Sequence, residues 1–123
     1  MRGTTLLLAA VMLLSGCQAF KSTFSSGQKG DADLAAGIRL YEDGNYKESM
    51  GKLQSALKLG LSDPNKVQAH KHLAFIHCAS SRPTPCRDEF RKALTLNPKF
   101  DLTPAEAGHP LWGPVFAKEK ARH

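Results

Sequence analysis

The sequence predicts an all-α protein of two helix–turn–helix repeats followed by a short C-terminal capping helix. Apolar residues recur with a helical period, and strand-like alternation is absent. The chain also repeats itself with a constant spacing. Ala74 lies 37 residues after Gly37, and Ala93 lies 37 residues after Ala56. A repeat of this length with helical periodicity predicts two stacked helical hairpins.

Residues 1–16 have the pattern of an export signal that is removed from the mature protein. Arg2 supplies a basic start, and an apolar run extends from Leu6 to Leu14. The run is too short to span a bilayer, which takes roughly 20 residues. A cleavage site of small residues follows it, so we expect the mature protein to begin shortly after this segment.

The end of the signal, Leu14-Ser15-Gly16-Cys17, resembles the lipobox of bacterial lipoproteins. The resemblance implies cleavage before Cys17, a thioether-linked diacylglycerol on its sulfur and an acyl chain on its amino group. No other cofactor is expected. Several acyl chains on one residue would give durable membrane anchoring. An ordinary signal peptide with a chance cysteine is the alternative.

The residue after the cysteine bears on the membrane to which the lipoprotein goes. In enteric lipoproteins an Asp at this position favours the inner membrane. Here it is Gln18, so the resemblance implies the outer membrane, with the protein facing the periplasm. Residues 17–31 would then comprise the lipidated cysteine and a flexible Ser-, Gly- and Lys-rich tether, with a reach of about 20 Å by a random-coil estimate.

Two copies of one motif fill residues 32–99. The first carries Gly37, the turn Gly44-Asn45-Tyr46 and Ala56. This copy resembles the tetratricopeptide repeat, a helix–turn–helix unit that stacks into an α-α superhelix. Two departures are Ser49 at an early alanine position of the second helix and Leu61 at the closing proline.

The second copy runs from Asn65 to Pro98. Ala74, Cys86 and Ala93 stand at its small positions. Its turn, Ser80-Ser81-Arg82-Pro83-Thr84-Pro85, departs from the family pattern, and we expect a seven-residue loop there. The small residues are the positions where the two helices of a hairpin approach closely.

Three N-cap and proline pairs predict the starts of later helices. They are Asp63-Pro64, Thr84-Pro85 and Thr103-Pro104. Glu106 adds a capping box to the last of them, and Gly108 is expected to end that short helix.

Residues 100–123 form a C-terminal cap or tail with an apolar stretch. One interpretation is that Leu111, Trp112, Val115 and Phe116 cover the exposed end of the second repeat, as repeat arrays require. The other is that this stretch docks on a partner.

The three cysteines divide into one lipid site and one pair. With Cys17 lipidated, Cys78 and Cys86 remain as an even pair in an oxidising compartment. They lie near the end of one helix and the start of the next, so we predict a disulfide across the second hairpin. Two buried free thiols are the alternative.

The net charge is +6, and the excess is concentrated between Lys66 and Lys99. Such a basic face fits anionic lipid, cell-wall carboxylates or an acidic protein, or it is simply a solvated surface. Nucleic acid is not expected as a partner of an exported protein.

The histidines and acidic residues do not predict chemistry. His70, His72 and His77 share one helix, but a metal site would need a ligand from another helix, and none is indicated. Neither a Ser-His-Asp pattern nor a glycine-rich phosphate loop is present. We therefore expect neither an enzyme nor a metal site.

The residues expected to contact a partner come from two places. The concave face of the repeats would carry Arg39, Leu40, His70 and His77, and the tail would carry Trp112 and Phe116. The resemblance implies a non-catalytic scaffold or assembly factor that holds a protein partner in a cell-envelope complex. A type VI secretion accessory lipoprotein is the most specific expectation. A peptidoglycan- or anionic-lipid-binding protein and a self-assembling subunit are the alternatives, and the sequence does not indicate an oligomeric state.

Overall fold

A computed structural model describes residues 29–123, and every regular element in this part of the chain is a helix. The all-α prediction is therefore confirmed for these residues. The signal peptide, Cys17 and most of the tether lie outside the described residues. The helices are α1 (Asp31–Glu42), α2 (Tyr46–Leu59), α3 (Asp63–Ala79), α4 (Pro83–Leu96), α5 (Pro104–Ala107) and α6 (Gly113–Lys120).

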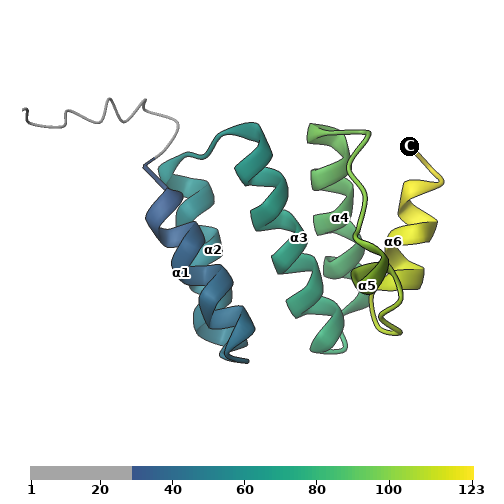
Figure 1. Ribbon diagram of the computed structural model, residues 1–123, viewed down its shortest axis with the longest axis horizontal. Helices are drawn as coiled ribbons and strands as arrows, with labels where there is room; N and C mark the ends of the chain where they lie inside the picture. Colours follow the sequence, from purple (N-terminus) through teal and green to yellow (C-terminus); the bar gives the residue numbers. More distant parts are fainter. Residues whose placement is uncertain (1–28) are drawn as a thin grey trace, which may run out of the picture.

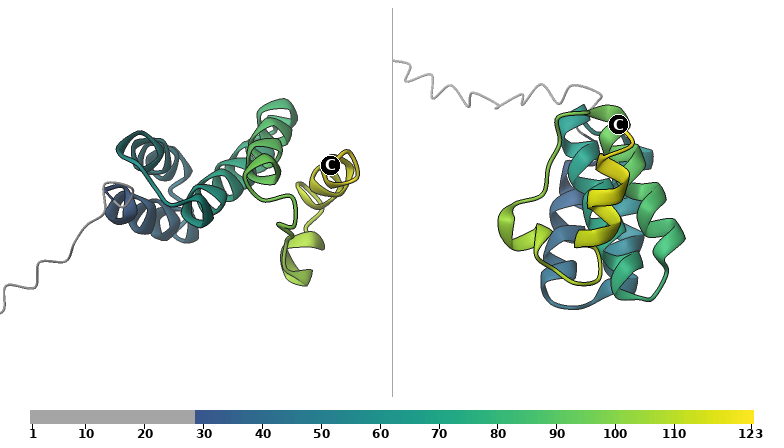
Figure 2. Two further views of the ribbon diagram at one scale, coloured as in Figure 1. Left: turned by 90° about the horizontal axis from the view of Figure 1, so that it is seen from above. Right: turned by 90° about the vertical axis from the view of Figure 1, so that its right-hand side faces the viewer.

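The first four helices run alternately up and down as two antiparallel pairs (Figure 1). α1 packs against α2, α3 packs against α4, and α2 and α3 join the pairs. The short α5 stands in front of α4 and packs beside α6, and α6 lies along α4 at the end of the array (Figure 2). The C-terminal segment thus contains two short helices where the sequence predicted one. None of the helices in residues 29–123 is both long and apolar enough to span a bilayer.

The two pairs share the spacing seen in the sequence. α1 and α3 end 37 residues apart, and α2 and α4 both begin and end 37 residues apart. α3 differs only in starting earlier relative to its counterpart, because Asp63 and Pro64 extend it at the N-terminus. The repeat is therefore a repeat of helix positions and not of sequence alone.

Both hairpins turn through the same three-residue motif. Gly44 has φ +80°, and Ser81, 37 residues later, has φ +59°. In the first turn, the Asn45 N–H donates to the Leu40 carbonyl; in the second, the Arg82 N–H makes the equivalent bond. A residue in the left-handed conformation together with a six-to-one hydrogen bond defines the Schellman motif. The expected seven-residue loop was wrong, because α3 continues to Ala79 and α4 begins at Pro83.

The starts of α3 and α4 also differ from the prediction. Ser62 and Arg82 occupy the N-cap positions in place of Asp63 and Thr84, and neither side chain caps its helix. Thr103 does cap α5 as predicted. Its hydroxyl accepts the Glu106 N–H at 3.2 Å, and Glu106 Oε1 accepts the Thr103 N–H at 2.9 Å.

Close helix approach within the first hairpin depends on two small residues. Gly37 and Ser49 are both buried, and the Ser49 hydroxyl donates to the Gly37 carbonyl at 2.6 Å. A Cβ on Gly37 would lie 2.8 Å from the Leu53 side chain, so only glycine fits without a shift. In the second hairpin, Ala74 and Cys86 are fully buried at the equivalent positions.

The cysteine pair closes the second turn. The sulfur atoms of Cys78 and Cys86 lie 1.99 Å apart, at disulfide distance, and the Cα atoms are 5.3 Å apart. Cys78 is in the last turn of α3 and Cys86 in the first turn of α4. The bond therefore spans the turn in which Ser81, a residue with a Cβ, holds a left-handed conformation that costs about 1 kcal/mol.

The C-terminal segment covers the end of the second hairpin. Trp112 and Phe116 are buried in one hydrophobic cluster with Phe75, Phe90 and other residues of α3 and α4. Val115 is partly buried against this cluster, whereas Leu111 is about half exposed. The segment therefore caps the helix array through three of the four apolar residues singled out in the sequence.

Replacing Gly37 with Ala should lower the free energy of unfolding by about 1–3 kcal/mol, because the added Cβ overlaps the Leu53 side chain. Gly51→Ala is the matched control. A Cβ there meets nothing within 4 Å, and Ala favours a helix interior over Gly, so stability should rise by about 0.5–1 kcal/mol. Urea denaturation of both variants measures the two effects, and equal effects would contradict close packing at Gly37.

Replacing both Cys78 and Cys86 with Ala should lower the free energy of unfolding by about 2–3 kcal/mol, from the closure entropy of the short loop. The measurement is chemical denaturation of the wild-type protein with and without reductant, beside the double variant. Reductant should destabilise the wild-type protein and leave the variant unchanged. Peptide mapping that found both thiols free in oxidised protein would contradict the pairing.

Candidate functional site

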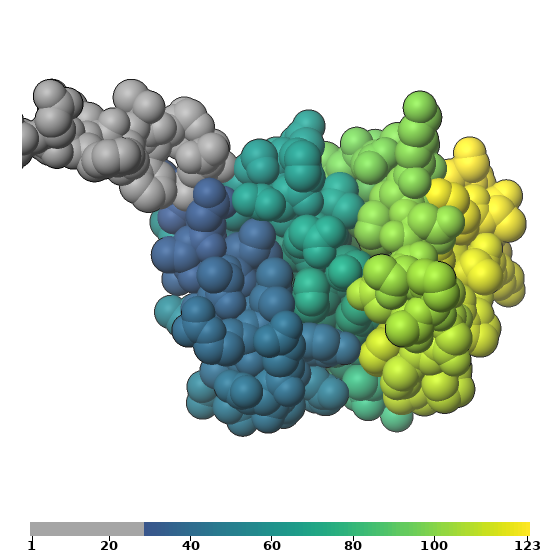
Figure 3. All heavy atoms as spheres, viewed as in Figure 1, coloured from purple at the N-terminus to yellow at the C-terminus, as the bar shows by residue number. Residues whose placement is uncertain are grey.

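The outer surface of α3 lies between α1 on one side and residues 97–107 on the other (Figure 3). We call this surface the α3 groove; its floor is formed by Gln68, Lys71, His72 and Phe75. Tyr41 of α1 packs edge-on against His72 with ring centroids 5.2 Å apart. On the other side, Lys71 Nζ reaches Glu106 of α5 at 2.9 Å. Contacts from both neighbours therefore fix the two sides of the groove.

A partly open cavity of about 340 Å³ occupies the half of the groove nearest the start of α3. Val67, Leu96 and Phe100 give it an apolar lining, and Gln68 and Asn97 add side-chain amides. The remaining lining residues are Asp63 and Pro64. An apolar surface with a few amide groups at its rim suits an apolar side chain of a peptide, whose backbone the amides could bond.

The other half of the groove is closed by the Lys71–Glu106 ion pair. The two side chains are 13% and 22% exposed, so this pair is partly shielded from water. Burial raises the pKa of Glu106, but hydrogen bonds from the Thr103 backbone N–H and from Lys71 outweigh burial and bring the pKa below its ordinary value of 4.5. Glu106 is therefore held as a carboxylate, and Lys71 lies 5.8 Å above the Phe75 ring.

A row of aromatic side chains lies beneath this half of the groove. Tyr46 stacks on Tyr41, Tyr41 contacts Phe75, and Phe75 stacks on Trp112 with centroids 4.3 Å apart. His109 stacks on the far face of the Trp112 ring system at 3.5 Å. Burial, Tyr46 and Glu106 together raise the pKa of Tyr41 to about 12, so its hydroxyl stays protonated at neutral pH. The row gives the groove a rigid apolar base.

His72 is neutral within this base. Its Nδ1–H donates to the Gln68 carbonyl at 2.8 Å, and its side chain is nearly buried. Burial lowers the pKa of His72, and the hydrogen bond to Gln68 offsets only part of the shift. A neutral, buried imidazole that already bonds its own helix serves as packing, not as a proton donor for chemistry.

His70 and His77 lie outside the α3 groove. His70 Nδ1 lies 2.6 Å from Glu89 Oε2 of α4, and both side chains are largely buried. Burial lowers the pKa of His77, and Arg82 lowers it further. Both histidines lie on one face of α3, at least about 100° around the helix from Lys71, so neither lines the α3 groove. Both stay partly exposed, and His70 borders an open pocket with Lys92 and Leu96, so a partner contact at this face stays a prediction.

The other predicted contact residues do not gather at one surface either. Arg39 is exposed, whereas Leu40, the next residue of α1, is partly buried and points about 100° away around the helix. Trp112 and Phe116 are 8% and 4% exposed, so neither offers a free docking surface. Among these six residues, only Arg39 is exposed, whereas Leu40, His70 and His77 are partly buried.

The basic excess of the second repeat is largely paired within the protein. Lys66 meets Asp63, Arg91 meets Glu119 and Asp88, and Lys92 meets Glu89. Burial raises the pKa of Glu119, but the Arg91 hydrogen bond outweighs it, so the carboxylate stays charged and ties α6 to α4. These basic side chains therefore form ion pairs within the protein, and these pairs would compete with any contact to a partner.

The sequence indicated Glu106 as a capping residue, but it indicated neither the pairing of Glu106 with Lys71 nor the positions of Tyr41 and Gln68 at the groove. The only sequence signal for Tyr41 was its aromatic side chain. Within residues 29–123, no three His, Cys, Asp or Glu side chains gather closely enough to hold a metal ion. No family model, curated protein or solved structure matches the chain.

Replacing Glu106 with Gln should lower the free energy of unfolding by about 1–3 kcal/mol at pH 7, because Lys71 loses a charged partner. The pH dependence of the free energy of unfolding gives the more specific test. Since the folded-state pKa of Glu106 is depressed, its contribution is present above pH 4.5 and is lost as the pH falls below that value. The variant should therefore lose less stability than the wild type between pH 5 and pH 3.

Glu48→Gln is the matched control, because Glu48 is exposed and pairs with no cation among the described residues. The control should keep the wild-type stability and pH profile, measured by urea denaturation across the pH series. Identical profiles for Glu106→Gln and the wild type would contradict the depressed pKa.

Proposed function

We propose that this chain is a lipid-anchored, non-catalytic scaffold that holds a segment of a protein partner in the α3 groove. The observation that carries the proposal is the cavity of about 340 Å³, which joins an apolar lining to the amides of Gln68 and Asn97. A peptide that inserts an apolar side chain here could also bond its backbone to these amides. This lining supports the binding of a peptide segment.

We further infer that the two hairpins are tetratricopeptide-like repeats of a short α-α superhelix. Support comes from the equal spacing of the helix ends and from the burial of small residues at equivalent positions. These are Gly37 and Ala74, Ser49 and Cys86, and Ala56 and Ala93. In such a stack the first helices of the hairpins line the concave surface, which corresponds to the positions of α1 and α3 here.

The proposed location rests on the sequence. A lipid on Cys17 would anchor the protein, and Gln18 favours the outer membrane with the domain in the periplasm. A scaffold of a cell-envelope complex, such as a secretion system of type VI, fits this location. The Cys78–Cys86 pair supports an oxidising compartment, because disulfides are rare where thiols are kept reduced.

The test is photocrosslinking in cells from one position in the groove and one outside it. A photoreactive residue at Gln68, which lines the cavity, should capture one dominant protein partner. The same residue at Gln54, which is exposed on α2, is the matched control and should not capture it. Equal capture from both positions would contradict binding in the groove, and capture only of the chain itself would indicate self-assembly.

Replacing Cys17 with Ala should abolish the lipid and release the protein from membranes, because the domain would lose its acyl chains. Metabolic labelling with a clickable fatty acid, followed by membrane fractionation, measures both effects. Retention of acyl label in the variant would contradict lipidation at Cys17. The Cys78→Ala/Cys86→Ala variant controls for the loss of cysteine and should keep the label.

A further inference from the structure

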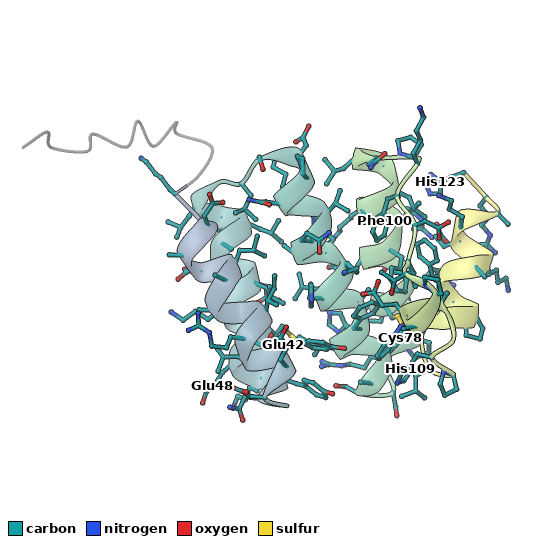
Figure 4. The ribbon with its side chains drawn as sticks, viewed as in Figure 1. Glu42, Glu48, Cys78, Phe100, His109 and His123 are labelled. Atoms are coloured by element: carbon teal, nitrogen blue, oxygen red, sulfur yellow. A yellow bond between two sulfur atoms is a disulfide. The ribbon has the colours of Figure 1, made fainter. Side chains whose placement is uncertain are left out.

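We propose that the end of the domain from which the tether leaves rests against an anionic phospholipid surface. We call it the tether end; it contains the start of α1, the ends of α2, α4 and α6, and the start of α3 (Figure 1). Figure 4 shows Phe100 and His123 at this end and Glu42 and Glu48 at the opposite end. The inference rests on the proposed lipid anchor and adds the orientation of the domain.

The two ends of the molecule differ in charge. The tether end carries more basic than acidic residues; the basic ones are Lys29, Lys58, Lys66, Lys99, Lys118, Lys120 and Arg122, and the acidic ones are Asp31, Asp33, Asp63, Asp101 and Glu119. The opposite end is closer to balance, with Glu42, Asp43 and Glu48 set against Arg39, Lys47, Arg82 and Arg87. The larger excess of positive charge therefore lies at the end where the tether joins the domain.

The acidic groups of the tether end are already engaged. Asp31 accepts a hydrogen bond from Asn65, Asp63 pairs with Lys66, and Glu119 is buried against Arg91. Asp101 accepts a hydrogen bond from the Leu102 backbone.

Basic groups of the tether end remain free for an outside partner. Lys29, Lys58 and Lys99 are exposed and pair with no carboxylate of the described residues. Free ammonium groups on one end are complementary to the phosphates of anionic lipid.

The length of chain before the domain keeps this end near the bilayer. Only residues 18–28 separate Cys17 from Lys29, and the flexible tether that their composition predicts would reach about 20 Å. α3, with 17 residues, is about 25 Å long, so the opposite end cannot approach the membrane as readily. Lysines within a Debye length of an anionic surface, about 8–10 Å at physiological salt, are attracted to it.

Amine footprinting of the full lipidated chain tests the orientation. The protein is inserted into vesicles of phosphatidylcholine or of an equal mixture of phosphatidylcholine and phosphatidylglycerol, and a water-soluble acylating reagent is added. Mass spectrometry then gives the reaction rate of each lysine. In the anionic vesicles, Lys58 and Lys99 should react about fivefold more slowly than in the neutral ones. Lys47, exposed at the opposite end, should react at the same rate in both.

High salt should abolish the difference, since the Debye length falls to about 3 Å at 1 M. In the Lys58→Gln/Lys99→Gln variant, the slowing at Lys29 should shrink, whereas Lys47→Gln should leave it unchanged. Equal rates in the two kinds of vesicle, or equal slowing at Lys47, would overturn the orientation. A chain that does not float with neutral vesicles would instead overturn the lipid anchor, so the two failures are distinguishable.

Discussion

The aromatic ring of Phe75 connects all parts of this domain. It is 2% exposed and contacts Tyr41 of α1, Phe90 of α4 and Trp112 of the C-terminal segment. Aromatic pairs of this kind contribute about 0.5–1.5 kcal/mol each beyond the area that they bury. Phe75 therefore links the two hairpins and the cap and supports the floor of the groove, while a second cluster that includes Leu53 and Leu73 also packs α3 against the first hairpin.

The helices and their repeat could be predicted because they depend on local and regular signals. Small residues at Gly37, Ala56 and Ala74 recur at the positions where helices touch, and the spacing survives in the structure. The second turn could not be predicted from its prolines. Pro83 and Pro85 suggested a loop, yet both lie in the first turn of α4, where backbone N–H groups have no intrahelical partner and proline is tolerated.

The candidate site was harder to predict than the fold, because it depends on how α3 is rotated. Three sides of α3 are covered, by α4 at Ala74, by the first hairpin at Leu73, and by α1 at His72. A helix that is apolar around most of its circumference gives no clear polar face in the sequence. His70 and Lys71 are neighbours in the chain, yet one bonds α4 and the other bonds α5. Pairings across helices follow from that rotation, which spacing alone does not determine.

The C-terminal segment acts as a cap, which is one of the two interpretations that the sequence left open; docking on a partner stays a prediction. Trp112 and Phe116 bury their rings in the cap, while Phe100 of the same segment, with Asn97 at the end of α4, lines the cavity. The Trp112 indole N–H donates to the Glu106 carbonyl at 2.9 Å and so ties the buried cap to the side of the groove.

Cap and groove are therefore one structural unit. Under the proposed function, a partner in the cavity would contact Phe100 of the docked segment and would stabilise the docked form by mass action. Binding in the groove would therefore raise the stability of the cap, and a more stable cap would raise the affinity of the groove for its partner.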